Sequence, residues 1–423
     1  MPATSPGRSV AARMSGRSID WPPTTRRAAS GPESELNVLR KAPTPRQVLA
    51  PIALLLMGCS LAFGAGPASA SHVSCGDTIT ADTTLDGDLV DCPSNGIVIG
   101  ANNVTLDLND HTVTGNGKRV KRCGRREFCD VGLLNDGHDG VTVRHGSVRD
   151  FGVGVFVGRA RHNRVLRVSS SRNFFFGFVI AESARSVVRD SSGSGNPAPE
   201  GDGIGLFGSR HIRVLDSSFR RNGLGMHVAD STNNVIKRNR FSRNGPSRNG
   251  PGIIIEADHN QVRRNRCARN GVCVLVAPGS RNVIAWNHSF RDKNGFALEK
   301  GRGNVLARNV VIRARGDGIY LGLLEPPIGG VNNVVRRNLV RGSGDAAFQV
   351  NPKDRHALLQ GNIASGAADD GFNVKGRSAT LVNNRAVRNT DLGIQAAFGV
   401  IDGGGNKAHG NGNPLQCTNI FCK

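Results

Sequence analysis

One short segment holds the densest group of polar and charged side chains on the chain. It reads Asn351-Pro352-Lys353-Asp354-Arg355-His356, and its proline interrupts a regular series of short apolar stretches. Abstraction of the proton next to a uronic-acid carboxylate requires a base, a cation that neutralises the carboxylate, and often an acid for the leaving oxygen. We therefore predict a candidate catalytic set in and near this segment: Lys353, Arg355, His356, Lys375 and Tyr320.

Each member of this set has an expected role. The base would be Lys353 or Lys375, with a pKa lowered by neighbouring positive charge. Arg355 would neutralise the substrate carboxylate, and His356 or Tyr320 would act as the acid. A simple proline-containing loop is the alternative interpretation of the same segment.

Polar side chains also recur at fixed offsets from a series of glycines. These glycines lie roughly 22 residues apart. They are Gly203, Gly225, Gly252, Gly271, Gly295, Gly318, Gly371 and Gly393, and Ala347 takes the place of a glycine in one repeat. Two and four residues later, the early repeats carry apolar residues, whereas polar ones prevail from Gly225 onward. We predict that these polar residues bind substrate: His227, Glu256, Glu299, Gln349, Asn351, Asn373 and Gln395. The alternative is a merely solvated outer face.

Carboxylates in the later repeats suggest two further kinds of site. Glu256 and Glu299 occupy equivalent positions two repeats apart, which predicts carboxylates about 9 to 10 Å from each other, near the separation used by inverting glycosidases. Aspartates also precede several of the later glycines, where their oxygens are suitable ligands for calcium. The candidate calcium ligands are Asp317, Asp345, Asp369 and Asp370. Ordinary Asp-Gly turn chemistry is the alternative.

A second repeated feature indicates the elements that must position these residues. Short valine-rich stretches each end in asparagine, in phase with the glycines: Asn239, Asn265, Asn287, Asn309, Asn338, Asn362 and Asn384. Strands this short cannot bury an apolar face alone, so the repeats must stack. No amphipathic helical stretch separates them, which excludes a βαβ architecture. We predict an all-β, single-stranded right-handed parallel β-helix of about 12 to 13 coils, with asparagine ladders at one turn and glycine with positive φ at another.

The repeat pattern resembles the pectate lyase-like superfamily of parallel β-helix proteins. That superfamily includes polygalacturonases, mannuronan epimerases and the periplasmic repeat proteins of nitrous-oxide-reductase maturation. The likeness spans residues 75–423 and implies a fold that often binds or processes glycans. Pro352 and Asp354 match the Asp-Pro-His-Asp motif of the epimerases, but Asn351 and Lys353 replace its first acid and its histidine.

The N-terminal segments are expected to lie outside the β-helix. Residues 1–45 are rich in Arg, Pro and Ser and are predicted to be disordered or to result from a misassigned start. Residues 46–70 combine basic residues, an apolar run and Ala68-Ser69-Ala70, which is typical of a signal peptide. Lipoprotein processing at Cys59 is the alternative. The remainder divides into an N-terminal cap (71–95), β-helix repeats (96–401) and a C-terminal tail (402–423), without a later transmembrane segment.

The cysteines favour an oxidising compartment. Eight remain after residue 70, and they form four pairs of near neighbours: Cys75 and Cys92, Cys123 and Cys129, Cys267 and Cys273, Cys417 and Cys422. An even number is what a disulfide framework requires, and we predict nearest-neighbour pairing. A zinc site is disfavoured because no pair has CxxC spacing and no histidines accompany them.

Charge indicates an acidic partner. The chain has 55 Lys and Arg, of which 8 precede residue 71, and 33 Asp and Glu, of which 3 do. The remainder therefore has 47 basic and 30 acidic residues, a formal charge of +17. Arginines recur just before ladder asparagines, often after a second basic residue: Arg238, Arg264, Arg308 and Arg337, with Lys237, Arg263 and Arg336. A β-helix would align them into a basic stripe that attracts polyanions. A solvated face is the alternative, and nucleic acid is disfavoured because Trp286 and Tyr320 are the only Trp and Tyr after residue 70.

Two functions from different classes follow. The first is a secreted enzyme that acts on an acidic polysaccharide as a lyase or epimerase, with calcium as a candidate cofactor. The second is a noncatalytic extracellular β-helix that binds envelope glycan or serves as a structural or adhesive rod. A role in assembling a copper enzyme is disfavoured because Met-rich and Cys-His clusters are absent.

Overall fold

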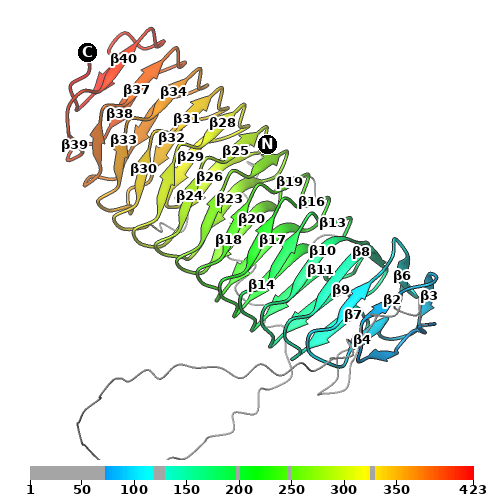
Figure 1. Cartoon of the computed structure of the whole chain (residues 1–423). Coiled ribbons are helices and arrows are strands. Elements are labelled where there is room, and N and C mark those ends of the chain that lie inside the picture. Colours follow the sequence, from blue (N-terminus) through cyan, green and yellow to red (C-terminus); the bar gives the residue numbers. More distant parts are fainter. Residues whose placement is uncertain (1–71, 119–128, 197–200, 246–248, 324–328) are drawn as a thin grey trace, which may run out of the picture.

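The chain winds into one elongated solenoid of stacked coils (Figure 1). The computed structural model describes residues 72–118, 129–196, 201–245, 249–323 and 329–423. Within these ranges the protein is an all-β parallel β-helix of about 14 turns and contains no helix. The predicted fold is confirmed. The turn number slightly exceeds the prediction because the segments expected to be caps also contribute paired strands, from β1 (Thr78–Ile79) at one end to β41 (Cys417–Thr418) at the other.

The longest sheet runs the whole length of the solenoid and takes one strand from each coil. We call it the long sheet. Its fifteen strands are, in order, β1, β4 (Ile97–Ile99), β7 (Val131–Asp136), β9 (Val153–Gly158), β11 (Phe176–Ala181), β14 (Asp202–Phe207), β17 (Leu224–Ala229), β20 (Pro251–Glu256), β23 (Val272–Val276), β26 (Asn294–Leu298), β29 (Ile319–Leu321), β32 (Phe348–Val350), β35 (Phe372–Val374), β38 (Ile394–Ala396) and β41.

Each coil then adds a strand to a second row, which we call the first short sheet. Its members are β2 (Thr83–Thr84), β5 (Thr105–Asp107), β8 (Thr142–Arg149), β10 (Arg164–Ser171), β12 (Val187–Arg189), β15 (Arg213–Leu215), β18 (Val235–Lys237), β21 (Gln261–Arg263), β24 (Val283–Ala285), β27 (Val305–Ala307), β30 (Val334–Arg336), β33 (Leu358–Gln360), β36 (Thr380–Val382) and β39 (Ile401–Asp402).

The third row, the second short sheet, completes each coil before the chain returns to the long sheet. It shares the extended strands β8 and β10 with the first short sheet. Its other members are β3 (Leu89–Cys92), β6 (Thr112–Gly115), β13 (Ser192–Ser194), β16 (Ser218–Arg220), β19 (Arg240–Ser242), β22 (Arg266–Ala268), β25 (His288–Phe290), β28 (Val310–Ile312), β31 (Leu339–Arg341), β34 (Ile363–Ser365), β37 (Arg385–Val387) and β40 (Lys407–His409).

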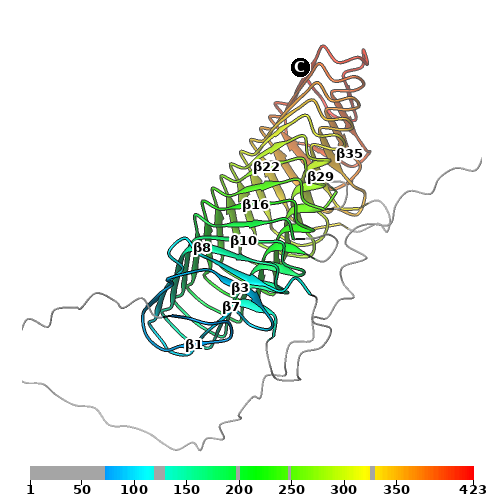
Figure 2. The same cartoon turned by 90° about the vertical axis from the view of Figure 1, so that its right-hand side faces the viewer.

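Parallel pairing between successive coils keeps equivalent residues in register. Arg240, for example, pairs with Arg266, which pairs with His288. Side chains at one position of the repeat therefore form rows along the solenoid, about 4.8 Å apart. The side view shows these coils stacked from β1 to the C-terminus (Figure 2).

The asparagines form the predicted ladder inside the solenoid. Asn239 Nδ2 donates to Asn265 Oδ1 at 3.1 Å, and Asn265 Nδ2 donates to Asn287 Oδ1 at 3.0 Å. The series continues in the same way to Asn406. Two further ladders, which we did not predict, stand at the other two corners, with Asn260 and Asn270 as members. All three ladders satisfy buried backbone groups where the strands turn.

The predicted reason for the strand-opening glycines is wrong. None of the eight has positive φ. They are glycines because a Cβ would collide with the next coil: at Gly225 it would lie 2.3 Å from the Gly252 carbonyl oxygen. Gly271 was also placed out of register, because the equivalent position in its coil is Cys273, next to Val274. The left-handed corners are instead occupied largely by arginine, asparagine, aspartate and histidine.

Pairs of phenylalanines stack in the interior. Phe219 and Phe241 stack with ring centroids 5.4 Å apart, and Phe348 and Phe372 do so at 4.6 Å. Three predicted disulfides are present: Cys75–Cys92, Cys267–Cys273 and Cys417–Cys422. The fourth predicted pair includes Cys123, which lies outside the described residues, as do the predicted signal peptide (46–70) and the segment 1–45. Among the described residues, no helical segment has the length and hydropathy to span a bilayer.

Candidate functional site

The predicted substrate-binding residues lie on the outer face of the long sheet, but their row is not continuously polar. The central outward position carries His227, Tyr320 and Gln349 in three coils. In the coils between His227 and Tyr320, it carries the apolar residues Ile254, Leu275 and Ala297, which form a separate cluster outside the main core. The expectation of a polar face from Gly225 onward is wrong for these coils.

Most of the polar residues on this face are buried and bond to one another. Asn351 is 3% exposed, donates to the Gly322 carbonyl oxygen at 2.6 Å and accepts from Gln349 Nε2 at 3.1 Å. Asn373 is 8% exposed, and its Oδ1 has no partner. Gln395, one coil further on, is partly exposed. This arrangement supplies few free groups to a ligand.

Glu299 and Tyr320 form a hydrogen-bonded pair on the long sheet. The Tyr320 hydroxyl donates to Glu299 Oε1 at 2.9 Å, and Glu299 Oε2 is buried without a partner. Burial raises the pKa of Glu299, whereas the hydrogen bond from Tyr320 opposes the shift. Burial and the neighbouring Glu299 raise the pKa of Tyr320 well above its ordinary value. Tyr320 therefore stays protonated, as the predicted role of an acid requires.

His227 joins two acids from neighbouring coils. Its Nε2 lies 3.0 Å from Glu256 Oε2, and its Nδ1 lies 3.9 Å from Asp202 Oδ2. Burial raises the pKa of Asp202 to about 7, although His227 opposes the shift. Asp202 was missed in the sequence, where its position directly before Gly203 was the available signal. Glu256 contacts His227 and Glu299 contacts Tyr320, and the pairing of the two glutamates in catalysis stays a prediction.

The predicted catalytic residues are divided between a corner and a sheet face. Lys353, Arg355 and His356 are exposed in the turn between β32 and β33, whereas Tyr320 lies within β29 and Lys375 directly follows β35. The outer surface has two grooves of about 540 and 590 Å³, and none of these five residues lines either groove. The assignment of this set to catalysis stays a prediction.

Aspartates gather at the corner that enters the long sheet, as the calcium prediction requires. Burial, Asp345 and Asp369 together raise the pKa of Asp317 to about 7. Burial and Asp369 raise the pKa of Asp370 to about 6. One carboxylate oxygen each from Asp369, Asp370 and Asp391 lies within 4.8 Å of the others. Asp391 was not predicted, and calcium binding here stays a prediction.

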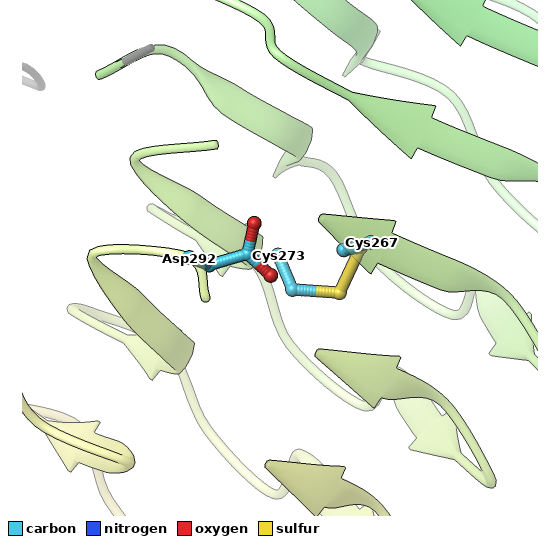
Figure 3. Close-up of side chains that lie close together, drawn as sticks. All are labelled: Cys267, Cys273 and Asp292. Carbon is cyan, nitrogen blue, oxygen red and sulfur yellow. A yellow bond between two sulfur atoms is a disulfide. The ribbon is translucent and has the colours of Figure 1, made fainter. Parts of the chain in front are cut away.

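A second group of metal-ligand types lies inside the solenoid (Figure 3). It consists of Cys267, Cys273 and Asp292, but the two sulfurs are joined in a disulfide and cannot act as thiolates. Asp292 ends an asparagine ladder, where it accepts from both nitrogens of Asn270 at 2.7 and 2.9 Å and from the Ser289 hydroxyl at 2.6 Å. This group is therefore structural.

Two rows of arginine border the second short sheet. The first corner row, between the short sheets, comprises Arg238, Arg264, Trp286, Arg308 and Arg337. The second corner row, where the chain leaves the second short sheet, comprises Arg221, Arg243, Arg269, Arg291 and Arg313. All ten residues have φ between 54° and 61°. Among the described residues, only Arg238 of these arginines forms an ion pair, with Asp216 at 2.5 Å.

A groove of about 540 Å³ lies on the outer face of the second short sheet, beside the second corner row. Among the residues that the structure describes, no carboxylate lines it, and six arginines do: Arg220, Arg221, Arg240, Arg243, Arg266 and Arg269. His288 also lines it, and burial together with Arg266 lowers the pKa of that imidazole. Like charges in adjacent rungs repel one another, so an anion in this groove would be stabilised.

A second groove of about 590 Å³ follows the long sheet at another corner. It is lined by groups of both signs, including Asp230, Glu256, Asp258, Lys300 and Arg302. Its mixed charge distinguishes it from the arginine-lined groove. It does not favour an anion over a cation.

Two family models match the sequence. Residues 79–287 match "Periplasmic copper-binding protein (NosD)", and residues 247–356 match "Right handed beta helix region". No curated protein matches the chain.

Several solved structures are similar to this chain at low identity. One is DFA-IIIase from Arthrobacter chlorophenolicus A6 (14% identity, 69% of this chain and 67% of that chain, TM-score 0.41). Another is PfbA, a surface adhesin of Streptococcus pneumoniae (12%, 76% and 84%, TM-score 0.45). A third is the tailspike protein of E. coli bacteriophage HK620 (12%, 82% and 64%, TM-score 0.43). A likeness of this degree concerns architecture and carries no residue of those proteins over to this chain.

Proposed function

We propose that this chain, which belongs to the right-handed parallel β-helix repeat family, binds an acidic polysaccharide along the outer face of its second short sheet. The observation that carries the proposal is the pair of corner rows, in which arginines stand in register over successive coils and, among the described residues, only Arg238 has an acidic partner. The disulfides suggest that it works outside the cytoplasm, in the cell envelope or beyond it.

The extent of the charge favours a polymer over a small anion. The second corner row continues through five successive coils, from Arg221 to Arg313. At about 4.8 Å per coil, its ends are separated by about 19 Å. A phosphate or sulfate ion would contact only one or two rungs, whereas a linear polyanion along the solenoid axis contacts all five.

Binding without turnover fits the geometry better than a lyase or epimerase. Of the candidate bases, Lys353 lies in a corner turn and Lys375 directly after β35 of the long sheet. Neither lines the arginine-bordered groove, and neither do the candidate acids Tyr320 and His356. The noncatalytic alternative derived from the sequence is therefore the one we develop. Lyase or epimerase activity remains a second candidate, supported by the protonated Tyr320 on the long sheet.

A copper site has less support from the residues present. The two groups of three metal-ligand types found among the described residues are the disulfide with Asp292 and the three aspartates at 369, 370 and 391. Neither group offers imidazole, thiolate or thioether, which are the ligands that copper prefers. We therefore do not extend the copper-binding description of the matching family model to this chain.

The proposal is tested by binding of the full chain to immobilised polygalacturonate, alginate and heparin, with dextran as the neutral control. We expect binding to the anionic polymers that weakens steeply with salt. The double variant Arg243→Gln/Arg269→Gln should bind at least several-fold more weakly. A matched control is Arg388→Gln/Arg185→Gln, because both residues are exposed, have φ of 55° and lie outside the groove. Equal losses in both double variants would contradict a localised site.

The same samples test turnover. Release of unsaturated uronate or a change in uronate composition, abolished by Lys353→Ala or Lys375→Ala, would establish the lyase or epimerase. Salt-sensitive binding without any product supports the noncatalytic protein.

A further inference from the structure

Trp286 occupies an unusual place in the first corner row. The other four members of that row are arginines, and every member has the left-handed backbone conformation, with φ of 61° at Trp286. A bulky aromatic residue is poorly suited to this conformation. The side chain is nevertheless 51% exposed, so burial in the core does not explain its presence.

The surroundings of Trp286 are basic. Arg308, one coil further on, places its Cζ 4.6 Å from the centroid of the indole ring. On the adjoining face of the first short sheet, small residues occupy the same coil and the next, Ala285 and Ala307. Arginines occupy the same position in the coils on either side, Arg263 and Arg336. Both alanines are buried, so neighbouring side chains cover them, and Arg263 and Arg336 flank the pair along this row.

One of these arginines carries an unsatisfied donor. Arg263 Nε is buried without a hydrogen-bond partner, although a buried donor of this kind normally has one. In the first corner row, Arg264 and Arg337 add two further guanidinium groups that form no ion pair among the described residues. Five arginines thus lie within two coils of the exposed indole, in its own row or the adjoining one, and Arg308 contacts it.

We propose that Trp286 is the stacking platform of a sugar-binding subsite for an acidic glycan. One pyranose ring lies against the indole, and acidic groups on that sugar and its neighbours pair with Arg263, Arg264 and Arg336. Arg308 holds the indole ring of Trp286 in place through its cation–π contact. The inference rests on the proposed function and specifies where the polymer is gripped, on the corner opposite the second corner row.

The isolation of Trp286 favours a sugar over a nucleobase. Single-stranded nucleic acids use successive aromatic residues for successive bases. Here the equivalent positions in adjacent coils are arginines, so one ring can stack while its neighbours contribute charge. This arrangement suits an acidic polysaccharide with a single stacked sugar.

The chain offers a specific spectroscopic test. Trp21 and Trp286 are its only tryptophans, so the full chain carrying Trp21→Phe reports on Trp286 alone. Titration with oligogalacturonate should change its emission saturably, whereas neutral malto-oligosaccharide should not. Trp286→Ala in otherwise wild-type protein should weaken binding to immobilised polygalacturonate by about tenfold, the effect expected for loss of an aromatic contact.

The decisive variant is Trp286→Arg, which makes the first corner row uniform. It adds positive charge at a position where arginine is already accommodated in the neighbouring coils, and circular dichroism would confirm that it folds. Stacking predicts weaker binding than the wild type despite the added charge. Tighter binding by Trp286→Arg, or binding to polygalacturonate without any change in Trp286 emission, would overturn the subsite and leave the proposed function intact. Failure of the wild type to bind any acidic glycan would instead overturn both the subsite and the proposed function. A larger saturable response of Trp286 emission to oligodeoxynucleotides would show that the indole stacks on a nucleobase and not on a sugar, which would also overturn the sugar subsite.

Discussion

The asparagine ladder allows a quantitative prediction at Asn265. This side chain is fully buried and takes part in four hydrogen bonds. Its Nδ2 donates to the Ile236 carbonyl oxygen at 2.9 Å and to Asn287 Oδ1 at 3.0 Å. Its Oδ1 accepts from the backbone nitrogen of Asn239 at 2.9 Å and from Asn239 Nδ2 at 3.1 Å. Asn265→Ala removes all four bonds and leaves the Asn239 N–H buried without this partner.

At about 1 kcal/mol for each hydrogen bond, the substitution should lower the free energy of unfolding by about 4 kcal/mol. Urea unfolding followed by circular dichroism measures the loss as a lower midpoint. The matched control is Gln261→Ala, an exposed position in the same coil, for which we expect a change within about 0.5 kcal/mol. A loss below about 1 kcal/mol for Asn265→Ala, or an equal loss in the control, would refute the ladder as a major source of stability.

Three further predictions concern packing, pH and metal. Gly225→Ala should destabilise the protein by about 2 kcal/mol or more, because its Cβ would lie 2.3 Å from the Gly252 carbonyl oxygen. Gly87→Ala should not destabilise it, because no atom lies within 4 Å of the added Cβ. Equal urea midpoints for the two variants would contradict the steric explanation. Burial raises the folded-state pKa of Asp202 to about 7, so ionisation of this carboxyl lowers the free energy of unfolding as the pH rises from about 4 through 7. Asp202→Asn should therefore raise the urea midpoint at pH 8 but not at pH 4, and equal shifts at both would exclude this cause. If the aspartate corner binds calcium, millimolar calcium should raise the melting temperature of the wild type but not of Asp369→Asn/Asp391→Asn; an equal response in both would remove the site from this corner.

The architecture could be predicted from sequence because it depends on repetition. Each coil contributes the same short strands and the same ladder asparagine, so an uncertainty in one coil is corrected by its neighbours. The glycines show the limit of this reasoning. Their spacing was informative, but their cause is a close approach of the next coil, as at Gly225, which depends on three-dimensional contacts. Gly271 was misplaced because a two-residue shift leaves the local pattern unchanged while Cys273 takes the equivalent position.

The candidate site was harder to predict because outward positions have no periodic requirement. Polarity at Gln349 and Asn351 suggested ligand binding, but their side chains bond to each other and are buried. Conversely, the arginine-lined groove depends on pairs such as Arg240 and Arg266, which are 26 residues apart in sequence and become neighbours only through the strand register. The basic residues before ladder asparagines did indicate one border of that surface, whereas the second corner row was not recognised.

The arrangement of the corner rows argues that the charge serves binding rather than folding. Every coil needs a left-handed residue at these corners, and glycine meets this need with the least strain. At the second corner the chain uses glycine in several coils, at Gly195, Gly342, Gly366 and Gly410, and isolated arginines in two others, Arg172 and Arg388. In the middle coils it uses arginine instead, from Arg221 to Arg313, although adjacent like charges repel and the backbone conformation is unfavourable for a residue with a side chain. Arginine continues without interruption at the second corner through the five coils that surround the groove and Trp286. An unbroken row of this kind is the pattern expected of a surface that meets an anionic partner.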